Sequence, residues 1–334
     1  MDRRWFLSMA AGVTAALAGC GGAGSGTTPT ATDAESATPS SSTDTPDELA
    51  TARDYLRRAA DRFSTEADEF GDVDEGASFD TAAIFAALDR ADEALASAEV
   101  SVSDADRRET VSALQSVSAF LRALTEALVD YEGGLSRLST ATTYTDNERY
   151  EDAISASREA KTAIEEGQDH LSTADDRRDD IAAASLESVD EVSVADLEEK
   201  FAALEQVMDA VLVVVDGYVD FNRGLVDYAS AVDAADGENW GDAADGFDSA
   251  ATDLDRARTH FESGEDEAPP GLTDSFIELT CAAGSLRDAS REFERAMQAA
   301  QRGDQSRYED HVEQAEDAAN RCSVTDDGDA SNSA

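Results

Sequence analysis

The chain has 334 residues, with 74 acidic side chains against 26 basic ones and a formal net charge of −48. A nucleic acid would have to approach a surface of its own sign. This argues strongly against nucleic-acid binding, and against attachment through anionic lipid headgroups. Hydrophobic residues make up 41% of the chain, enough for a core, whereas aromatic residues at 6% supply few large anchors.

The N-terminal segment carries the strongest functional signal. Arg3 and Arg4 precede a short apolar run over residues 10–18, which is too short to span a bilayer as a stable helix. The run ends in Leu17-Ala18-Gly19-Cys20, small residues followed by a cysteine. This order resembles the Tat export signal joined to the lipobox of bacterial and archaeal lipoproteins. The resemblance implies that the Cys20 thiol receives a diacylglyceryl group and that the chain is anchored to the extracytoplasmic face of the cell membrane.

The resemblance also sets the first boundaries of the chain. Residues 1–19 form the signal peptide, which is removed. Residues 20–46 hold the lipidated cysteine and a Thr-, Ser- and Pro-rich segment that is almost free of large apolar side chains. Such a segment cannot bury enough surface to offset chain entropy, so we predict a disordered tether with a reach of about 30 Å. Residues 324–334 are predicted to form a disordered acidic tail.

The acidic residues are interleaved with Ala, Leu and Val rather than gathered in blocks. This composition, with only two lysines among the 26 basic residues, resembles the proteins of extreme halophiles. In molar salt the Debye length falls to about 3 Å, so the self-repulsion of such a chain is largely screened. A specific acidic-ligand or calcium-binding role is the alternative that this composition leaves open.

The body of the chain has the periodicity of long helices. No proline occurs over residues 47–268, and the alternating three- and four-residue spacing of apolar residues predicts one apolar stripe per helix. Two such stripes are Leu114, Val117, Leu121, Leu124, Leu128, Tyr131, Leu135 and Leu138, and Leu197, Phe201, Leu204, Met208, Val211, Val215, Tyr218 and Leu225. We predict helices over 47–70, 79–100, 104–142, 146–187, 194–236, 239–264, 272–302 and 305–322. Thr145 and Glu148 have the spacing of a capping box for the fourth helix. The fold class is therefore all-α: an elongated bundle of about eight helices in long antiparallel hairpins over 47–323, with a sub-boundary near 188–193.

A weak internal repeat accompanies the helices. Leu128-Val-Asp-Tyr131 recurs as Leu225-Val-Asp-Tyr228, and each copy precedes a turn and an aromatic residue, Tyr150 or Trp240, with a third aromatic at Tyr308. These turns resemble those of tetratricopeptide-type helical hairpins. The aromatic residues are 90 and 68 positions apart, far from a 34-residue period, so we predict no tetratricopeptide array.

The sequence shows no motif for catalysis or for a metal. Hydrolase, phosphate-loop and zinc motifs are missing, so we predict neither an enzyme nor a bound cofactor. The three histidines, His170, His260 and His311, have no suitable ligand three or four positions further along the same helix. The imelysin-like iron-uptake lipoproteins are also exported and helical, but their His-x-x-Glu motif is missing here. We therefore predict no metal site.

Two cysteines remain once Cys20 carries lipid. Cys281 and Cys322 lie on the two arms of the last hairpin, whose turn we place near Gly303. An exported protein is in a compartment that favours disulfides. The two arms differ in length by about one helical turn, which a small shift of the turn can absorb. The sequence predicts a disulfide between them, with two packed free thiols as the alternative.

The residue that stands out within an apolar stripe is Asn222, which lies between Tyr218 and Leu225. A buried Asn can fix helix register or the choice of partner. Two glycines nearby, Gly217 and Gly224, would let another helix or a small ligand come close. The predicted ligand or partner surface comprises Tyr218, Phe221, Asn222, Tyr228 and Trp240.

Taken together, these features predict a lipid-anchored helical module for interaction or scaffolding, with an unidentified protein partner. The alternative is a helical solute- or metal-binding lipoprotein associated with transport. A cleft lined by the aromatic residues of the predicted surface would favour ligand capture, whereas a closed bundle would favour scaffolding.

Overall fold

The computed structural model describes residues 47–67, 79–101, 104–183, 194–265, 268–269 and 271–322. The predicted signal peptide, the tether, the sub-boundary near 188–193 and the acidic tail therefore lie outside the described residues. The described part is all-α, with no strand. Its helices are α2 (Glu48–Ala67), α3 (Thr81–Ser101), α4 (Ala105–Asp146), α5 (Tyr150–Ala183), α6 (Val194–Asp236), α7 (Trp240–Glu265), α8 (Thr273–Gln301), α9 (Gln305–Ala319) and the 3₁₀ helix η2 (Asn320–Cys322).

The predicted all-α bundle is confirmed, and the helix bounds follow the apolar periodicity closely. The predicted helix over 194–236 coincides with α6. The helix bounds differ most at the turn between α4 and α5: α4 continues to Asp146 rather than stopping at residue 142, and α5 begins at Tyr150 rather than at residue 146. Long periodic segments locate helices well because a stripe of apolar residues must face a neighbouring helix.

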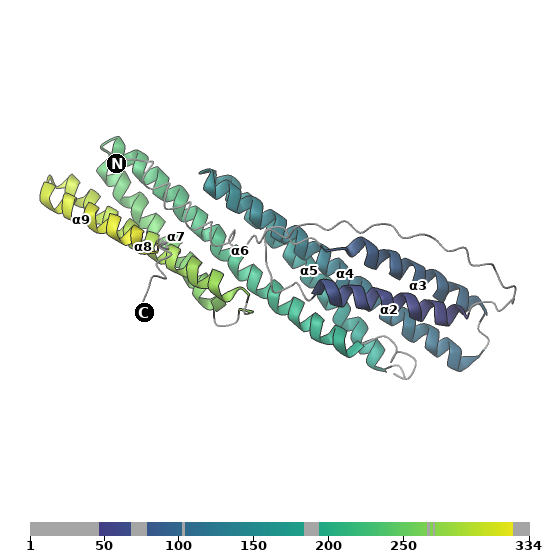
Figure 1. Cartoon of the computed structure of the whole chain (residues 1–334). Coiled ribbons are helices and arrows are strands. Elements are labelled where there is room, and N and C mark those ends of the chain that lie inside the picture. The colour runs from purple at the N-terminus through teal and green to yellow at the C-terminus, as the bar shows by residue number, and fades with distance from the viewer. Residues whose placement is uncertain are drawn as a thin grey trace, which may run out of the picture.

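The helices form an elongated array in which each one runs antiparallel to the next along the chain (Figure 1). The central element is α6, whose 43 residues give it a length of about 64 Å. It packs mainly against α5 and α7, with smaller contacts to α2, α4 and α8. Both α5 and α7 contact α6 near its middle. There the Lys161 Nζ of α5 lies 2.7 Å from Asp216 Oδ1, and Gly217 faces Phe261 of α7.

Small residues bring paired helices close together in both long hairpins. A Cβ atom at Gly134 of α4 would lie 2.4 Å from Ile164 Cδ1 of α5. A Cβ atom at Gly224 of α6 would lie 2.7 Å from Leu254 Cγ of α7. Neither position has room for a side chain, so the apolar residue of the partner helix packs directly onto the glycine backbone.

These two contacts reveal a structural repeat with a separation of 90 residues. Gly134 and Gly224 are 90 positions apart, as are their partners Ile164 and Leu254. The same separation relates His170 to His260, and each histidine faces an aspartate that obeys it as well. The hairpins α4–α5 and α6–α7 are therefore built on one plan.

The repeat does not follow the sequence match at Leu128–Tyr131 and Leu225–Tyr228. With a separation of 90, the counterpart of Tyr131 is Phe221, and the second copy of the match lies seven residues closer to its turn. Seven residues are about two helical turns, so both copies still face the core. The recurring letters reflect a shared apolar face rather than equivalent positions.

The turns that end α4, α6 and α8 share one geometry, the Schellman motif. In the first turn, Arg149 N donates to Tyr144 O at 2.8 Å and Glu148 N donates to Thr145 O at 3.0 Å. The same two bonds recur at the other two turns: Asn239 N to Ala234 O, Glu238 N to Ala235 O, Asp304 N to Ala299 O and Gly303 N to Ala300 O. The likeness among the three turns therefore lies in their backbone.

This geometry shows that the predicted capping box is wrong. Thr145 lies in the last turn of α4, and Glu148 takes the left-handed conformation that the motif requires, with φ of 60°. The third turn also differs from the other two in its aromatic residue. Tyr150 and Trp240 directly follow their turns, whereas Tyr308 comes one helical turn later.

The left-handed position gives a direct test of the turns. Gly303 has φ of 73° and open space around its missing Cβ, so Gly303→Ala should lower the free energy of unfolding by about 1 kcal/mol through backbone strain alone. Glu238 has φ of 59°, so Glu238→Gly should raise it by about 0.5–1 kcal/mol. Urea denaturation in high salt measures both.

A matched control is Gly284→Ala in the middle of α8, where the nearest atom is 3.5 Å from the added Cβ. Because this glycine is helical, the substitution should stabilise the protein. Equal effects of Gly303→Ala and Gly284→Ala would contradict the assignment of the turn.

Candidate functional site

Four of the five residues of the predicted ligand or partner surface lie in the core. The exposed fractions are 1% for Tyr218, 2% for Phe221, 0% for Asn222 and 3% for Tyr228, whereas Trp240 is partly buried. The prediction of a surface at these positions is therefore corrected. Gly217 and Gly224 do allow a helix to come close, but that helix is α7 of the same chain, whose Phe261 packs on Gly217.

The aromatic residues of this region stabilise the packing of neighbouring helices. The Tyr228 ring of α6 is 5.1 Å from the Phe247 ring of α7 and 5.9 Å from the Phe293 ring of α8, both edge to face. Trp240 makes a similar contact with Tyr308, at 6.5 Å between ring centres. These aromatic residues fill the space between helices, so they line no cleft there.

Asn222 is fully buried and its side chain is satisfied. Its Nδ2 donates to Tyr218 O at 2.9 Å, and its Oδ1 accepts from the Thr145 hydroxyl of α4 at 2.8 Å. The Thr145 hydroxyl has the Ala141 carbonyl at 3.1 Å as an alternative acceptor. The polar contact ties the end of α4 to the middle of α6, which fits the predicted role of Asn222 in fixing helix register.

A disulfide joins Cys281 of α8 to Cys322, the last residue of η2, with the Cα atoms 5.8 Å apart. The 3₁₀ segment rises about 2.0 Å per residue, more than an α-helix, and so lengthens the shorter arm of the hairpin. The bond fixes η2 to the side of α8. Arg321, next to Cys322, is thereby placed beside Asp288, with Nη2 to Oδ2 at 3.0 Å.

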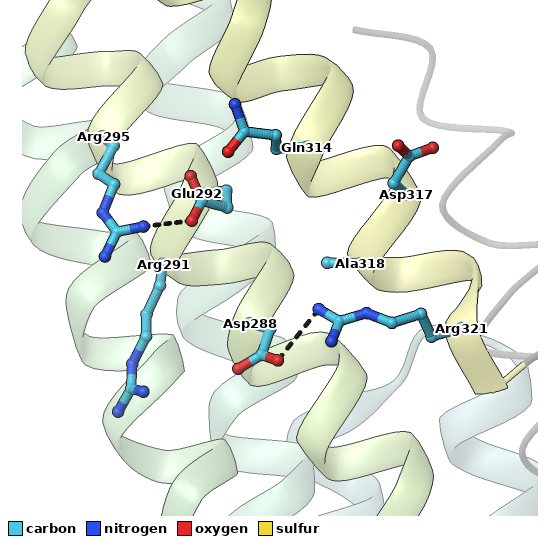
Figure 2. Close-up of a pocket in the computed structure, with 8 residues that line it drawn as sticks. All are labelled: Asp288, Arg291, Glu292, Arg295, Gln314, Asp317, Ala318 and Arg321. Atoms are coloured by element: carbon cyan, nitrogen blue, oxygen red, sulfur yellow. Dashed lines mark hydrogen bonds and ion pairs between the residues drawn. The ribbon is translucent and has the colours of Figure 1, made fainter.

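The same two helices form an open groove of about 550 Å³ (Figure 2). We call it the arginine groove. It is lined by Asp288, Arg291, Glu292 and Arg295 of α8, by Gln314, Asp317 and Ala318 of α9, and by Arg321 of η2. Both α8 and the α9–η2 arm supply residues at the first, fourth, fifth and eighth positions of a helical stretch, so each arm contributes one continuous face.

Ion pairs hold several of the groove side chains in place. Glu292 uses one carboxylate oxygen for Arg295 and the other for His311 Nδ1, which lies 2.9 Å away. Burial alone would raise the pKa of Asp288, but the guanidinium groups of Arg287 and Arg321 outweigh it and lower that pKa. Arginine therefore dominates the electrostatics around Asp288.

All three histidines face carboxylates on the preceding helix of their own hairpin. The spacing of ligands along a single helix does not reveal these pairs, because they form only when two helices meet. They are His170 Nδ1 to Glu126 Oε2 at 3.3 Å, His170 Nε2 to Asp130 Oδ2 at 3.4 Å, His260 Nε2 to Asp220 Oδ2 at 3.6 Å and the His311 pair described above. Burial raises the pKa of Asp130, against the effect of His170.

No known protein family, curated protein sequence or solved structure matches this chain. Within the described ranges, no group of three or more His, Cys, Asp or Glu side chains is arranged to hold a metal ion. None of the described helices is both long enough and apolar enough to cross a membrane. Cys20, Arg3 and Arg4 lie outside the described residues.

The contact between Thr145 and Asn222 gives a stability prediction. Thr145→Val removes the hydroxyl that donates to buried Asn222 Oδ1, so the free energy of unfolding should fall by about 1–3 kcal/mol. The double variant Thr145→Val/Asn222→Leu replaces both polar groups and should recover part of the loss. Thr143→Val, at an exposed position of the same helix, is the control and should change stability by less than about 0.5 kcal/mol. A loss in the control as large as that of Thr145→Val would contradict the role of the buried contact.

Proposed function

We propose that the protein is a lipoprotein exported through the Tat route and anchored by Cys20 to the outer face of the cell membrane. It acts there as a helical interaction module in high salt. The observation that carries the proposal is the order of the N-terminal features: Arg3-Arg4, a short apolar run, and Leu17-Ala18-Gly19-Cys20.

The packing of the helices supports an interaction module rather than a solute-binding protein. Ligand capture between the central helices would need a cleft lined by Tyr218, Phe221 and Tyr228, but these side chains are buried against neighbouring helices. A partner would then bind to the outside of the bundle, where the groove between α8 and α9 lies.

The shape of the molecule suits presentation at a distance from the membrane. The tether leads into α2, which packs with α3 and with parts of α4 and α6. The last two helices, α8 and α9, lie toward the opposite end of the elongated array (Figure 1). The predicted tether, with a reach of about 30 Å, would keep the α2 end within that distance of the lipid and leave the α8–α9 end free to extend farther from it.

The charge of the chain supports a high-salt setting. Its 74 acidic residues repel one another over about 30 Å at 0.01 M salt but over only about 3 Å in molar salt. Salt weakens the repulsion between distant charges more than it weakens the attraction between two charged groups in direct contact. The bridges between helices include a contact of 2.9 Å from Arg122 to Asp92 and one of 2.9 Å from Arg287 to Asp255.

Membrane fractionation of the native cells tests the proposal. Cys20→Ser removes the lipid acceptor, so the protein should leave the membrane fraction or accumulate as uncut precursor. Replacing Arg3 and Arg4 by lysine should block export. The control is Cys281→Ser/Cys322→Ser, which removes the other two thiols and should leave the protein in the membrane fraction.

Mass spectrometry of the mature N-terminus completes this test. The expected result is a diacylglyceryl-modified Cys20 as the first residue. A processed Cys20→Ser protein that stays in the membrane would refute anchoring at this residue, and normal surface delivery of the lysine variant would refute the Tat route.

A further inference from the structure

The arginine groove has a charge balance unlike that of the chain as a whole. Across the chain, 74 acidic residues stand against 26 basic ones. Among the eight residues that line the groove, three arginines stand against three acids. An acidic ligand that the rest of the surface would repel meets no net negative charge here.

The arginines of the groove differ in how far they are already neutralised. Arg321 pairs with Asp288, and Arg295 pairs with Glu292, whose second oxygen faces His311. Among the residues that the structure describes, no ion pair joins Arg291 to a carboxylate, but Arg291 is close enough to Glu294 to oppose the rise that burial causes in the pKa of that carboxyl group. Arg291 is exposed, and the Arg295 side chain retains 55% of its exposure. Both are accessible from solvent.

The spacing of these two arginines matches the spacing of side chains on an extended peptide. Arg291 and Arg295 are four positions apart on α8, which puts their Cβ atoms about 6 Å from each other on one face. Alternate side chains of an extended strand are about 6.6 Å apart on one side of the backbone. Planar guanidinium groups bind carboxylates through two parallel hydrogen bonds.

We propose that the arginine groove binds an extended, acidic segment of a partner protein, in which alternate carboxylates pair with Arg291 and Arg295. This inference rests on the proposed function and adds to it the contact surface and the chemistry of the partner. Arg321, held by the Cys281–Cys322 disulfide, is the third cationic group and fixes the end of the site beside Asp288. Gln314 and Asp317 line the facing side of the groove, where Gln314 Nε2 donates to Asp310 O of its own helix at 3.0 Å.

Fluorescence anisotropy with a labelled peptide tests the proposal. The probe is an octapeptide of alternating Asp and Ser, titrated with the full-length mature protein in detergent at a fixed high salt concentration. Arg291→Gln/Arg295→Gln should weaken binding at least tenfold, since it removes both bidentate contacts. The control is Arg90→Gln/Arg158→Gln, two exposed arginines on other helices, which changes the net charge equally and should leave the affinity unchanged.

The outcomes separate this proposal from its alternatives. Equal binding by the groove variant and the control variant would overturn it, because attraction would then depend only on net charge. Binding of citrate at the groove without binding of the peptide would also overturn it, since the site would then take a small carboxylate. Circular dichroism of each variant shows that the fold is retained. Membrane anchoring through Cys20 is measured separately by fractionation, so either result can fail without the other.

Discussion

The fold depends on the continuity of α6. Over its 43 residues this one helix packs against both α5 and α7, the second helices of the two long hairpins. A helix with one apolar stripe can serve two sets of neighbours only if it stays straight enough for both to pack along it. Both neighbours contact α6 near its middle, where Lys161 of α5 reaches Asp216 and Phe261 of α7 packs on Gly217. The contact between Asn222 and Thr145 lies one to two turns beyond this point and fixes the end of α4 against α6.

Two features explain how so acidic a chain stays compact: the helices pack closely, and the few cationic side chains form ion pairs between helices. Glycines at the helix crossings bring backbones together, and alanines occupy much of the core, so little surface is left open between helices. The scarce cationic groups are used between helices as well as within them. Lys161 bridges α5 to α6, Arg122 bridges α4 to α3, and Arg287 bridges α8 to α7.

Much of the fold follows from local information in the sequence, and what does not follow depends on contacts between helices. Apolar periodicity located every described helix because its cause is local to each helix. The capping box failed because the Schellman bonds of Glu148 and Arg149 outweigh the alternative in which Thr145 starts a new helix. The sequence predicts a surface at the aromatic residues near Asn222 because one sequence does not show which helix covers a face. The arginine groove was missed for the same reason, since its two walls are far apart in the chain.

The continuity of α6 can be measured directly as a distance between two spin labels. Glu198 and Ser230 are exposed positions near the two ends of the helix, 32 residues apart, and a continuous α-helix places them about 48 Å from each other. Double electron–electron resonance on full-length protein labelled at these positions, with the Cys281–Cys322 disulfide intact, gives the distribution of this distance. The account predicts a single narrow peak near this value in high salt. A broad distribution, or a peak shorter by more than about 10 Å, would show a break in α6 and contradict the account.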